Sequence, residues 1–292
     1  MKIAIYGKTV ADKDKSYLVQ LIAALKDRNT EMFFFEPFYN KIKDFVEISG
    51  KPNLFLTHEE LTKNADYLFS IGGDGTLLDT LSLVRDSGIP ILGINLGRMG
   101  FLSSISRDRI TTALDKLFEK KYILDKRTLI GLKTEEHLFG DMNYAVNEVS
   151  IYRKSPLSML KIEAWVNDEF LNAYWADGLI VATPTGSTAY SLSNGGPIIV
   201  PGSSNFVITP IATHNLTVRP IVIPDSSKIS IKVVGRTDEF YINLDSRSVL
   251  ASSGTVFTIA REDFTINLVN LEDESYFKTI RNKLMWGLDI RN

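Results

Sequence analysis

The chain has 292 residues and a formal net charge of −2 at pH 7, from 33 Lys and Arg against 35 Asp and Glu. Hydrophobic residues make up 44% and charged residues 23%, which is typical of a folded protein with room for two domains. The balanced charge argues against a nucleic acid as the main partner. The absence of cysteine excludes disulfides, thiolate metal sites and a Cys nucleophile, and the three histidines are too widely spaced to favour a multi-His metal site. No apolar run approaches the roughly 18 residues of a membrane span, so we expect a cytoplasmic protein without a membrane partner.

The first 125 residues alternate between strand and helix patterns. Four short apolar runs are typical of buried strands, at residues 2–6, 32–35, 65–71 and 89–94. A helical repeat follows the first run, at Leu18, Leu21, Ile22 and Leu25. A second helix is predicted over residues 77–85. This alternation predicts an α/β domain over residues 1–125, a Rossmann-like parallel sheet covered by helices.

From residue 126 to 270 the apolar period becomes two, which predicts an all-β domain of the two-layer β-sandwich type. One expected hairpin begins with residues 160–166 and turns at Asn167-Asp168. The others pair residues 229–233 with 241–244, and 256–260 with 264–268 through a turn at 261–263.

The last segment, residues 271–292, returns to a helical pattern. Phe277, Ile280, Leu284 and Leu288 share one helical face. An amphipathic helix must bury that face, and we expect it to pack on the α/β domain, because the β strands cover one another.

The first candidate site is the loop Gly72-Gly-Asp-Gly-Thr76, between a predicted strand and a predicted helix. Ligands bind at this end of parallel strands, and the glycines allow close backbone approach to a phosphate. Asp74 would repel a phosphate, which makes sense if it accepts a proton from a hydroxyl or works beside a metal. The alternative is a tight turn with Asp74 as the N-cap of the helix. The glycines alone leave the two interpretations equally open.

The second candidate site is the segment 174–197, in which a short apolar strand at 179–182 leads into a run of hydroxyls and glycines. Hydroxyls and backbone amides suit sugars and phosphates, and Tyr190 offers a face on which a base can stack. On composition alone, a solvent-exposed loop is the commoner outcome. Asp177-Gly178 just before the strand and the apolar run at 197–200 argue against a slack loop.

Taken in order and spacing, five stretches resemble the NAD kinase family: residues 72–76, 93–101, 147–148, 177–197 and 219–225. The glycine loop alone is unspecific, because several lipid and sugar kinases carry similar loops. The hydroxyl-rich block at residues 183–193, preceded by the pair Asn147-Glu148, is highly specific.

The resemblance implies transfer of a phosphoryl group from ATP or polyphosphate to the 2′-hydroxyl of the adenosine ribose of NAD, which gives NADP. It implies a divalent cation, Mg²⁺, bound mainly through the donor phosphates and not by assigned protein ligands. It also implies a homo-oligomer, a tetramer, whose β domain supplies the interface. Asp74 becomes the catalytic base, and the donor phosphates lie on Gly72, Gly73, Gly75 and Thr76.

The resemblance also implies a set of NAD-binding residues. They are Asp74, Gly75, Asn147, Glu148, Asp177, Thr185, Thr188, Ala189, Tyr190, Ser191, Leu192 and Ser193. Tyr190 would stack on the adenine, and Asp177 would bind the sugar on the nicotinamide side. Without the resemblance, Asn147-Glu148 would be interpreted as a surface turn and Asp177 as a turn residue.

Three positions depart from the family pattern. Asp79 and Trp175 stand where members carry basic residues, and Asp245-Ser-Arg247 stands where many carry Gln. The choices between NAD and NADH and between ATP and polyphosphate therefore stay open. A lipid kinase is disfavoured by the hydroxyl-rich acceptor segment, and a non-catalytic dinucleotide sensor is disfavoured by the presence of Asp74.

Overall fold

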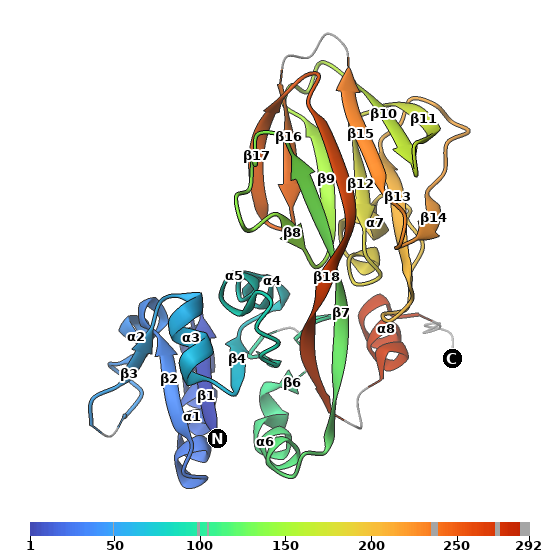
Figure 1. Cartoon of the computed structure of the whole chain (residues 1–292). Coiled ribbons are helices and arrows are strands. Elements are labelled where there is room, and N and C mark those ends of the chain that lie inside the picture. The colour runs from blue at the N-terminus through green and yellow to red at the C-terminus, as the bar shows by residue number, and fades with distance from the viewer. Residues whose placement is uncertain (49, 98–99, 104, 235–238, 272–274, 287–292) are drawn as a thin grey trace. The chain divides into compact units, whose positions relative to one another are not determined.

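The computed structural model describes residues 1–48, 50–97, 100–103, 105–234, 239–271 and 275–286 (Figure 1). The chain forms two compact units: Met1–Lys126 together with Ile266–Asn292, and Arg127–Thr265. Strands β7 (Tyr122–Thr134) and β18 (Val256–Leu271) each contribute residues to both units. Among the described residues, no helix has the length and apolar character needed to cross a membrane.

The first unit contains a parallel sheet, as the strand–helix alternation predicts. Its strands are β1 (Lys2–Gly7), β2 (Glu31–Phe35), β3 (Asn53–Phe55), β4 (Tyr67–Ile71), β5 (Ile91–Asn95) and the short β6 (Ile105–Ser106). The spatial order is β3-β2-β1-β4-β5, and every one of these pairs is parallel. The order reverses between β1 and β4, where doubly wound sheets bind ligands beyond the carboxyl ends of their strands.

The first unit also contains helical segments, and those over residues 15–27, 36–42 and 110–118 share a buried apolar cluster with its strands. The helical segments are η1 (Asp12–Asp14), α1 (Lys15–Asp27), α2 (Glu36–Ile42), α3 (His58–Asn64), α4 (Asp74–Asp79), α5 (Leu81–Val84), η2 (Arg107–Arg109), α6 (Ile110–Phe118) and α8 (Tyr276–Leu284). The predicted apolar face of α1 is buried, at Leu18, Leu21, Ile22 and Leu25. The predicted apolar face of α8 is largely wrong, because Ile280 is buried but Phe277 and Leu284 are exposed, at 56% and 38%. The fourth expected face residue, Leu288, lies outside the described residues.

The predicted helix at 77–85 is wrong in its bounds. Helix α4 begins at Asp74, three residues earlier, and Thr80 separates it from α5. The Thr80 hydroxyl donates to the carbonyl of Leu77 at 2.6 Å. A threonine that bonds back to its own helix competes with the regular ladder, which accounts for an interruption at this position.

The second unit is all-β and antiparallel, which confirms the predicted class. Its strands are β7, β8 (Tyr144–Ala145), β9 (Glu148–Arg153), β10 (Leu160–Val166), β11 (Glu169–Ala176), β12 (Gly178–Ala182), β13 (Asn205–Ile211), β14 (Ile221–Pro224), β15 (Ile229–Val234), β16 (Glu239–Leu244), β17 (Arg247–Ser252) and β18. One sheet has the order β14-β13-β12-β9-β16-β17, and β11-β10-β15-β18 run in the other. A single buried apolar cluster takes residues from both sheets, for example Ile151 from β9 and Ile231 from β15.

Two of the three predicted hairpins are wrong. Strand β15 pairs with β10 and β18, whereas β16 pairs with β9 and β17 in the other sheet. The expected turn at 261–263 does not exist, because β18 runs without a break from Val256 to Leu271. The hairpin of β10 and β11 is confirmed, and its turn residues Asn167 and Asp168 have φ angles of 51° and 67°. Asn and Asp tolerate this left-handed region, and a two-residue hairpin turn favours it.

Candidate active site

The glycine loop lies at the carboxyl end of β4, beside the end of β1. The parallel register pairs Gly7 with Ile71, so Lys8 and Gly72 are the first residues beyond two neighbouring strands. This is the point of the sheet at which the strand order reverses. The loop therefore occupies the ligand-binding edge expected of a doubly wound sheet.

The three glycines of the loop differ in what a side chain at each position would contact. Gly72 has φ +151°, and a Cβ there would stand 2.4 Å from the Thr76 hydroxyl. A Cβ on Gly73 or Gly75 would meet no protein atom within 4 Å. The fold thus requires glycine at 72 only, and the bare backbone at 73 and 75 leaves open space for a ligand.

The carboxylate of Asp74 is held by three successive backbone N–H groups. Oδ2 accepts from Phe101 at 2.7 Å, and Oδ1 accepts from Leu102 at 3.1 Å and Ser103 at 2.9 Å. A Cβ at Gly100 would stand 1.7 Å from Oδ1, so this approach requires glycine at that position. The N-cap interpretation is wrong, because the N-cap of α4 is Gly73 and no side chain caps it. The hydrogen bonds instead fix the orientation of the Asp74 carboxylate.

In the second unit, the block 183–193 is ordered and largely buried, so the solvent-loop interpretation is wrong. It contains η3 (Gly186–Thr188) and α7 (Tyr190–Ser193). Ser187 and Ser191 are fully buried and bond to neighbouring segments, Ser187 to the carbonyl of Ile199 at 3.2 Å and Ser191 to Thr209 at 2.8 Å. These hydroxyls hold the shape of the block.

The other predicted residues of the block differ in exposure. Thr185 is buried, and its hydroxyl accepts from Arg127 at 3.3 Å. Thr188, Ala189 and Leu192 are half-buried, while Ser193 is exposed. Tyr190 keeps 40% of its surface exposed at the start of α7. Its ring is the large side chain of this block that a flat ligand could reach.

Glu148 is the first residue of β9 and is buried, so the surface-turn interpretation of the Asn147-Glu148 pair is wrong. Burial and, to a smaller extent, the charge of Asp245 raise the pKa of Glu148 to about 8, although a hydrogen bond from the Tyr190 backbone opposes both effects. Near neutral pH the Glu148 carboxyl therefore carries a proton and can donate a hydrogen bond.

Asp177 lies between β11 and β12 and forms an ion pair with Arg153 at 2.9 Å. Burial raises the pKa of Tyr190, and the charges of Asp177 and Glu148 are among the further causes, as is Tyr152. The fold therefore brings Tyr190, Asp177 and Glu148 into one neighbourhood. Arg153 and Tyr152 belong to no recognisable motif, so sequence reasoning missed them.

Of the three departures from the family pattern, Asp79 and Arg247 have side-chain partners, and Trp175 is largely exposed. Asp79 pairs with Lys8 at 2.5 Å. Trp175 lies on β11 with 52% of its surface exposed. Arg247 donates to the backbone carbonyls of Met142 and Tyr144.

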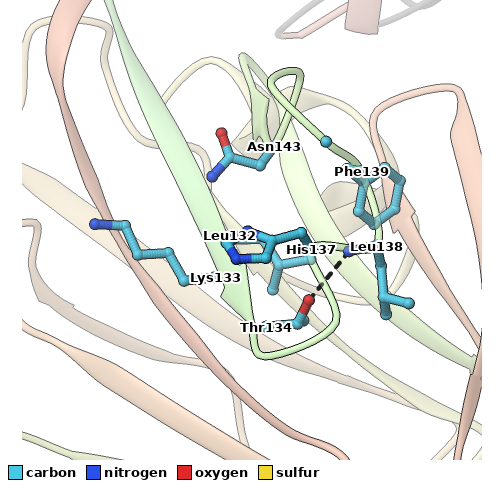
Figure 2. A pocket seen from close by; sticks show the side chains of 8 residues that line it. Leu132, Lys133, Thr134, His137, Leu138, Phe139 and Asn143 are labelled. Carbon is cyan, nitrogen blue, oxygen red and sulfur yellow. Dashed lines mark hydrogen bonds between the residues drawn. The ribbon is translucent and has the colours of Figure 1, made fainter.

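Two cavities of the second unit lie away from these residues. One, of about 330 Å³, is formed by the loop after β7 (Figure 2), where the Leu138 N–H donates to the Thr134 hydroxyl at 3.2 Å. The other has a volume of about 440 Å³ and is lined by charged residues that include Lys133, Lys228 and Arg261. Neither contains a predicted site residue. Within the described parts of the chain, no three His, Asp or Glu side chains gather in a way that could hold a metal.

Within the first unit, a glycine loop at the reversal point of a parallel sheet and an oriented carboxylate beside it form the arrangement expected of a phosphotransferase. Residues 19–122 match the ATP-NAD kinase N-terminal domain, and residues 146–271 match the ATP-NAD kinase C-terminal domain. The chain belongs to the NAD kinase family, the enzymes that phosphorylate NAD to NADP.

Full-length relatives and solved structures agree with this assignment. The chain is 45% identical to the NAD kinase of Flavobacterium psychrophilum and 40% identical to that of Bacteroides fragilis, in both cases over 100% of each chain. The structure of an Archaeoglobus fulgidus NAD kinase in complex with ATP has a TM-score of 0.77 and 26% identity, covering 98% of this chain and 99% of that one. Yeast NADH kinase complexed with NADH has a TM-score of 0.87, covering 100% and 89%, and its 23% identity supports the fold alone.

Proposed function

We propose that this protein transfers the terminal phosphoryl group of ATP to the 2′-hydroxyl of the adenosine ribose of NAD. Polyphosphate as donor and NADH as acceptor are the alternatives that the assay must separate. The observation that carries the proposal is the Asp74 carboxylate, fixed by three backbone N–H groups beside an open glycine backbone.

The donor phosphates lie on the loop Gly72–Thr76 in this proposal. The open space at Gly73 and Gly75 supports it, because a phosphate can approach backbone N–H groups only where no side chain intervenes. Helix α4 has only six residues, so its dipole adds little. Positioning and charge neutralisation dominate phosphoryl transfer, and the loop supplies the positioning.

Asp74 orients the 2′-hydroxyl and accepts its proton as the new oxygen–phosphorus bond forms, while the bond from the γ-phosphorus to the bridging oxygen breaks and ADP leaves. An oriented acceptor suits this step, because the reacting atoms must be held close together and aligned before transfer. The carboxylate accepts one N–H on Oδ2 and two on Oδ1, and each oxygen has a limited number of lone pairs. We therefore expect Oδ2 to be the oxygen that faces the hydroxyl.

The dinucleotide lies against the second unit in this proposal. Tyr190 stacks on the adenine, with Thr188, Ala189 and Ser193 beside it, and Asn147 and Glu148 bind the adenosine part. Asp177 binds the other sugar. The buried hydroxyls of Thr185 and Ser191 act through the shape of the block, because their polar atoms already have protein partners.

A divalent cation, Mg²⁺, completes the proposed site through the donor phosphates. The residues present fit this arrangement, because the open backbone at Gly73 and Gly75 leaves room for donor phosphates that carry their own cation. When bound, the cation neutralises phosphate charge. The side chains of this loop hold the phosphates and the acceptor in position.

We also propose a homotetramer in the cytoplasm. The outer face of the six-stranded sheet carries a cross-strand row of Leu250, Tyr241 and Tyr152, each with 36–37% of its surface exposed. An apolar row of this kind favours an interface between copies of the chain. Light scattering at assay concentration tests this state, and a fully active monomer would contradict it.

The decisive experiment measures NADP formed from NAD, ATP and Mg²⁺, using a dehydrogenase specific for NADP. Parallel reactions replace ATP with polyphosphate, NAD with NADH, whose product is NADPH, and NAD with diacylglycerol, for which the release of ADP is measured. We expect turnover with NAD and ATP and none with the lipid. Absence of NADP and NADPH from every dinucleotide reaction would refute the proposal.

A further inference from the structure

Asp245 and Arg247 stand at the hairpin between β16 and β17, where many family members carry Gln. Leu244 pairs with Arg247 across this hairpin, so Asp245 and Ser246 form its two-residue turn. Asp245 has φ 51°, a left-handed conformation that is uncommon for a residue other than glycine. A two-residue hairpin turn favours this region, and Asp tolerates it.

The carboxylate of Asp245 is bound by three successive N–H groups, those of Val146, Asn147 and Glu148. Oδ2 accepts from Val146 at 2.9 Å, and Oδ1 accepts from Asn147 at 2.8 Å and Glu148 at 3.3 Å. The Asp245 N–H in turn donates to the carbonyl of Glu148 at 3.1 Å. One side chain thus determines where three consecutive backbone groups lie.

Arg247 holds the residues that precede this segment. Its two terminal nitrogens donate to the carbonyls of Met142 and Tyr144. Because both nitrogens are used by the backbone, the guanidinium of Arg247 contributes to the shape of residues 142–148. Its positive charge also lies close to Asp245.

The opposite side of the segment is held by the hydroxyl-rich block. The Thr183 hydroxyl donates to the carbonyl of Val146, and the Thr183 N–H donates to the carbonyl of Asn147 at 2.9 Å. A Cβ at Gly186 would stand 2.0 Å from that same Asn147 carbonyl. The backbone of Asn147 is thus fixed from two directions, and its side chain is half-buried.

We propose that Asp245 and Arg247 are positioning residues that hold Asn147 and Glu148 in the geometry that receives the dinucleotide. Arg247 makes no contact with the nucleotide. Asp245 acts through the main chain of residues 146–148, and Arg247 acts through the main chain of 142–144. This inference rests on the proposed dinucleotide site, but the hydrogen bonds that it invokes can be tested without any substrate.

The first arm of the experiment is hydrogen exchange in the substrate-free protein, followed at the amides of Val146, Asn147 and Glu148. In Asp245→Asn the amide nitrogen replaces one acceptor oxygen, so we expect these amides to exchange at least ten times faster than in the wild type. Arg261→Gln is the matched control. Arg261 lies on β18, in the other sheet, and contacts Asp225, another buried carboxylate of the second unit, at 3.2 Å. Unchanged exchange in Asp245→Asn would overturn the inference, even if the protein had no activity on NAD.

The second arm is the KM for NAD across Arg247→Gln, Arg247→Lys and Arg247→Met. A glutamine can still donate to one carbonyl and a methionine to none, so positioning predicts a KM that rises from wild type to Gln to Met, by about tenfold for Met. The KM for ATP should stay within twofold. A direct contact between Arg247 and a charge of the nucleotide predicts a different order. The KM for NAD of Arg247→Lys would then be close to that of the wild type, and Arg247→Gln and Arg247→Met would have equal KM values. That order, or a constant KM for NAD, would overturn the inference.

Discussion

The carboxylate of Asp74 occupies the place where the side chain of any residue other than glycine at position 100 would begin. A Cβ on Gly100 would stand 1.7 Å from Oδ1 of Asp74. The next three residues then donate their N–H groups to that carboxylate. The hydrogen bonds therefore join the glycine loop to residues 100–103, although Gly75 and Gly100 are 25 positions apart in the chain.

Gly100→Ala should reduce kcat by a factor comparable to the loss of Asp74 itself, because the new methyl group displaces the carboxylate. Gly97→Ala is the matched control, since its Cβ would meet only Asn95 Oδ1 at an ordinary 3.7 Å. The double variant with Asp74→Asn should lose less than the product of the two single effects, as expected for residues that act as a unit. Steady-state rates of all four proteins test this, and strictly multiplicative losses would contradict it.

Asp74→Asn should lower kcat by about 10²- to 10⁴-fold, the usual contribution of a general base, while calorimetric NAD affinity stays close to that of the wild type. It should also lower stability, because the Asn nitrogen cannot accept the Phe101 N–H, and an unsatisfied buried donor costs about 1–3 kcal/mol. Asp14→Asn serves as the control, since it weakens another buried carboxylate contact, with Arg107 at 3.0 Å. An Asp74→Asn enzyme with near wild-type kcat would end the general-base assignment.

Tyr190→Ala should raise the KM for NAD about 5- to 150-fold with little change in kcat. Stacking of a base on an aromatic ring contributes roughly 1–3 kcal/mol and is the same in the ground and transition states. The exposed ring at the start of α7 is available for such a contact. Tyr190→Phe keeps the ring and should resemble the wild type. If KM is unchanged in the alanine variant, Tyr190 does not touch the adenine.

The stability of the protein should fall as the pH rises from about 5 to about 8, in part because of Glu148. Its pKa is raised from 4.5 to about 8, so over this range the folded protein holds a proton that the unfolded chain has released. Rising pH therefore lowers the free energy of unfolding. Once the pH exceeds the pKa of the folded state, the total loss is about 1.4 kcal/mol for each unit by which the pKa is raised. Glu148→Gln cannot ionise and should show a flatter curve of Tm against pH. Identical slopes for both proteins would show that Glu148 is ionised in the fold.

Sequence reasoning located the glycine loop that is proposed as the catalytic motif, and several of the strands that position it. The strands around residues 2–7 and 67–71 were predictable because apolar runs bounded by turn residues are a local signal. The position of the loop Gly72–Thr76 then followed, since ligands gather at the carboxyl ends of parallel strands. The hydroxyl-rich block was recognisable for its order and spacing of residue types.

The sequence by itself therefore determined the fold class and the family, and it predicted the residues that are proposed to carry chemistry. The tertiary structure decided which strands are neighbours, and it placed β15 and β16 in different sheets. The alternation of apolar and polar residues predicts which face of a strand is buried, but it does not predict which strand pairs with each edge. It also decided how Asp74 and Asp245 are held. Their partners are backbone N–H groups 27–29 and 97–99 residues away in the chain. Every residue except proline carries such a group, so no residue type marks the donors, and only the folded chain brings them to the carboxylates.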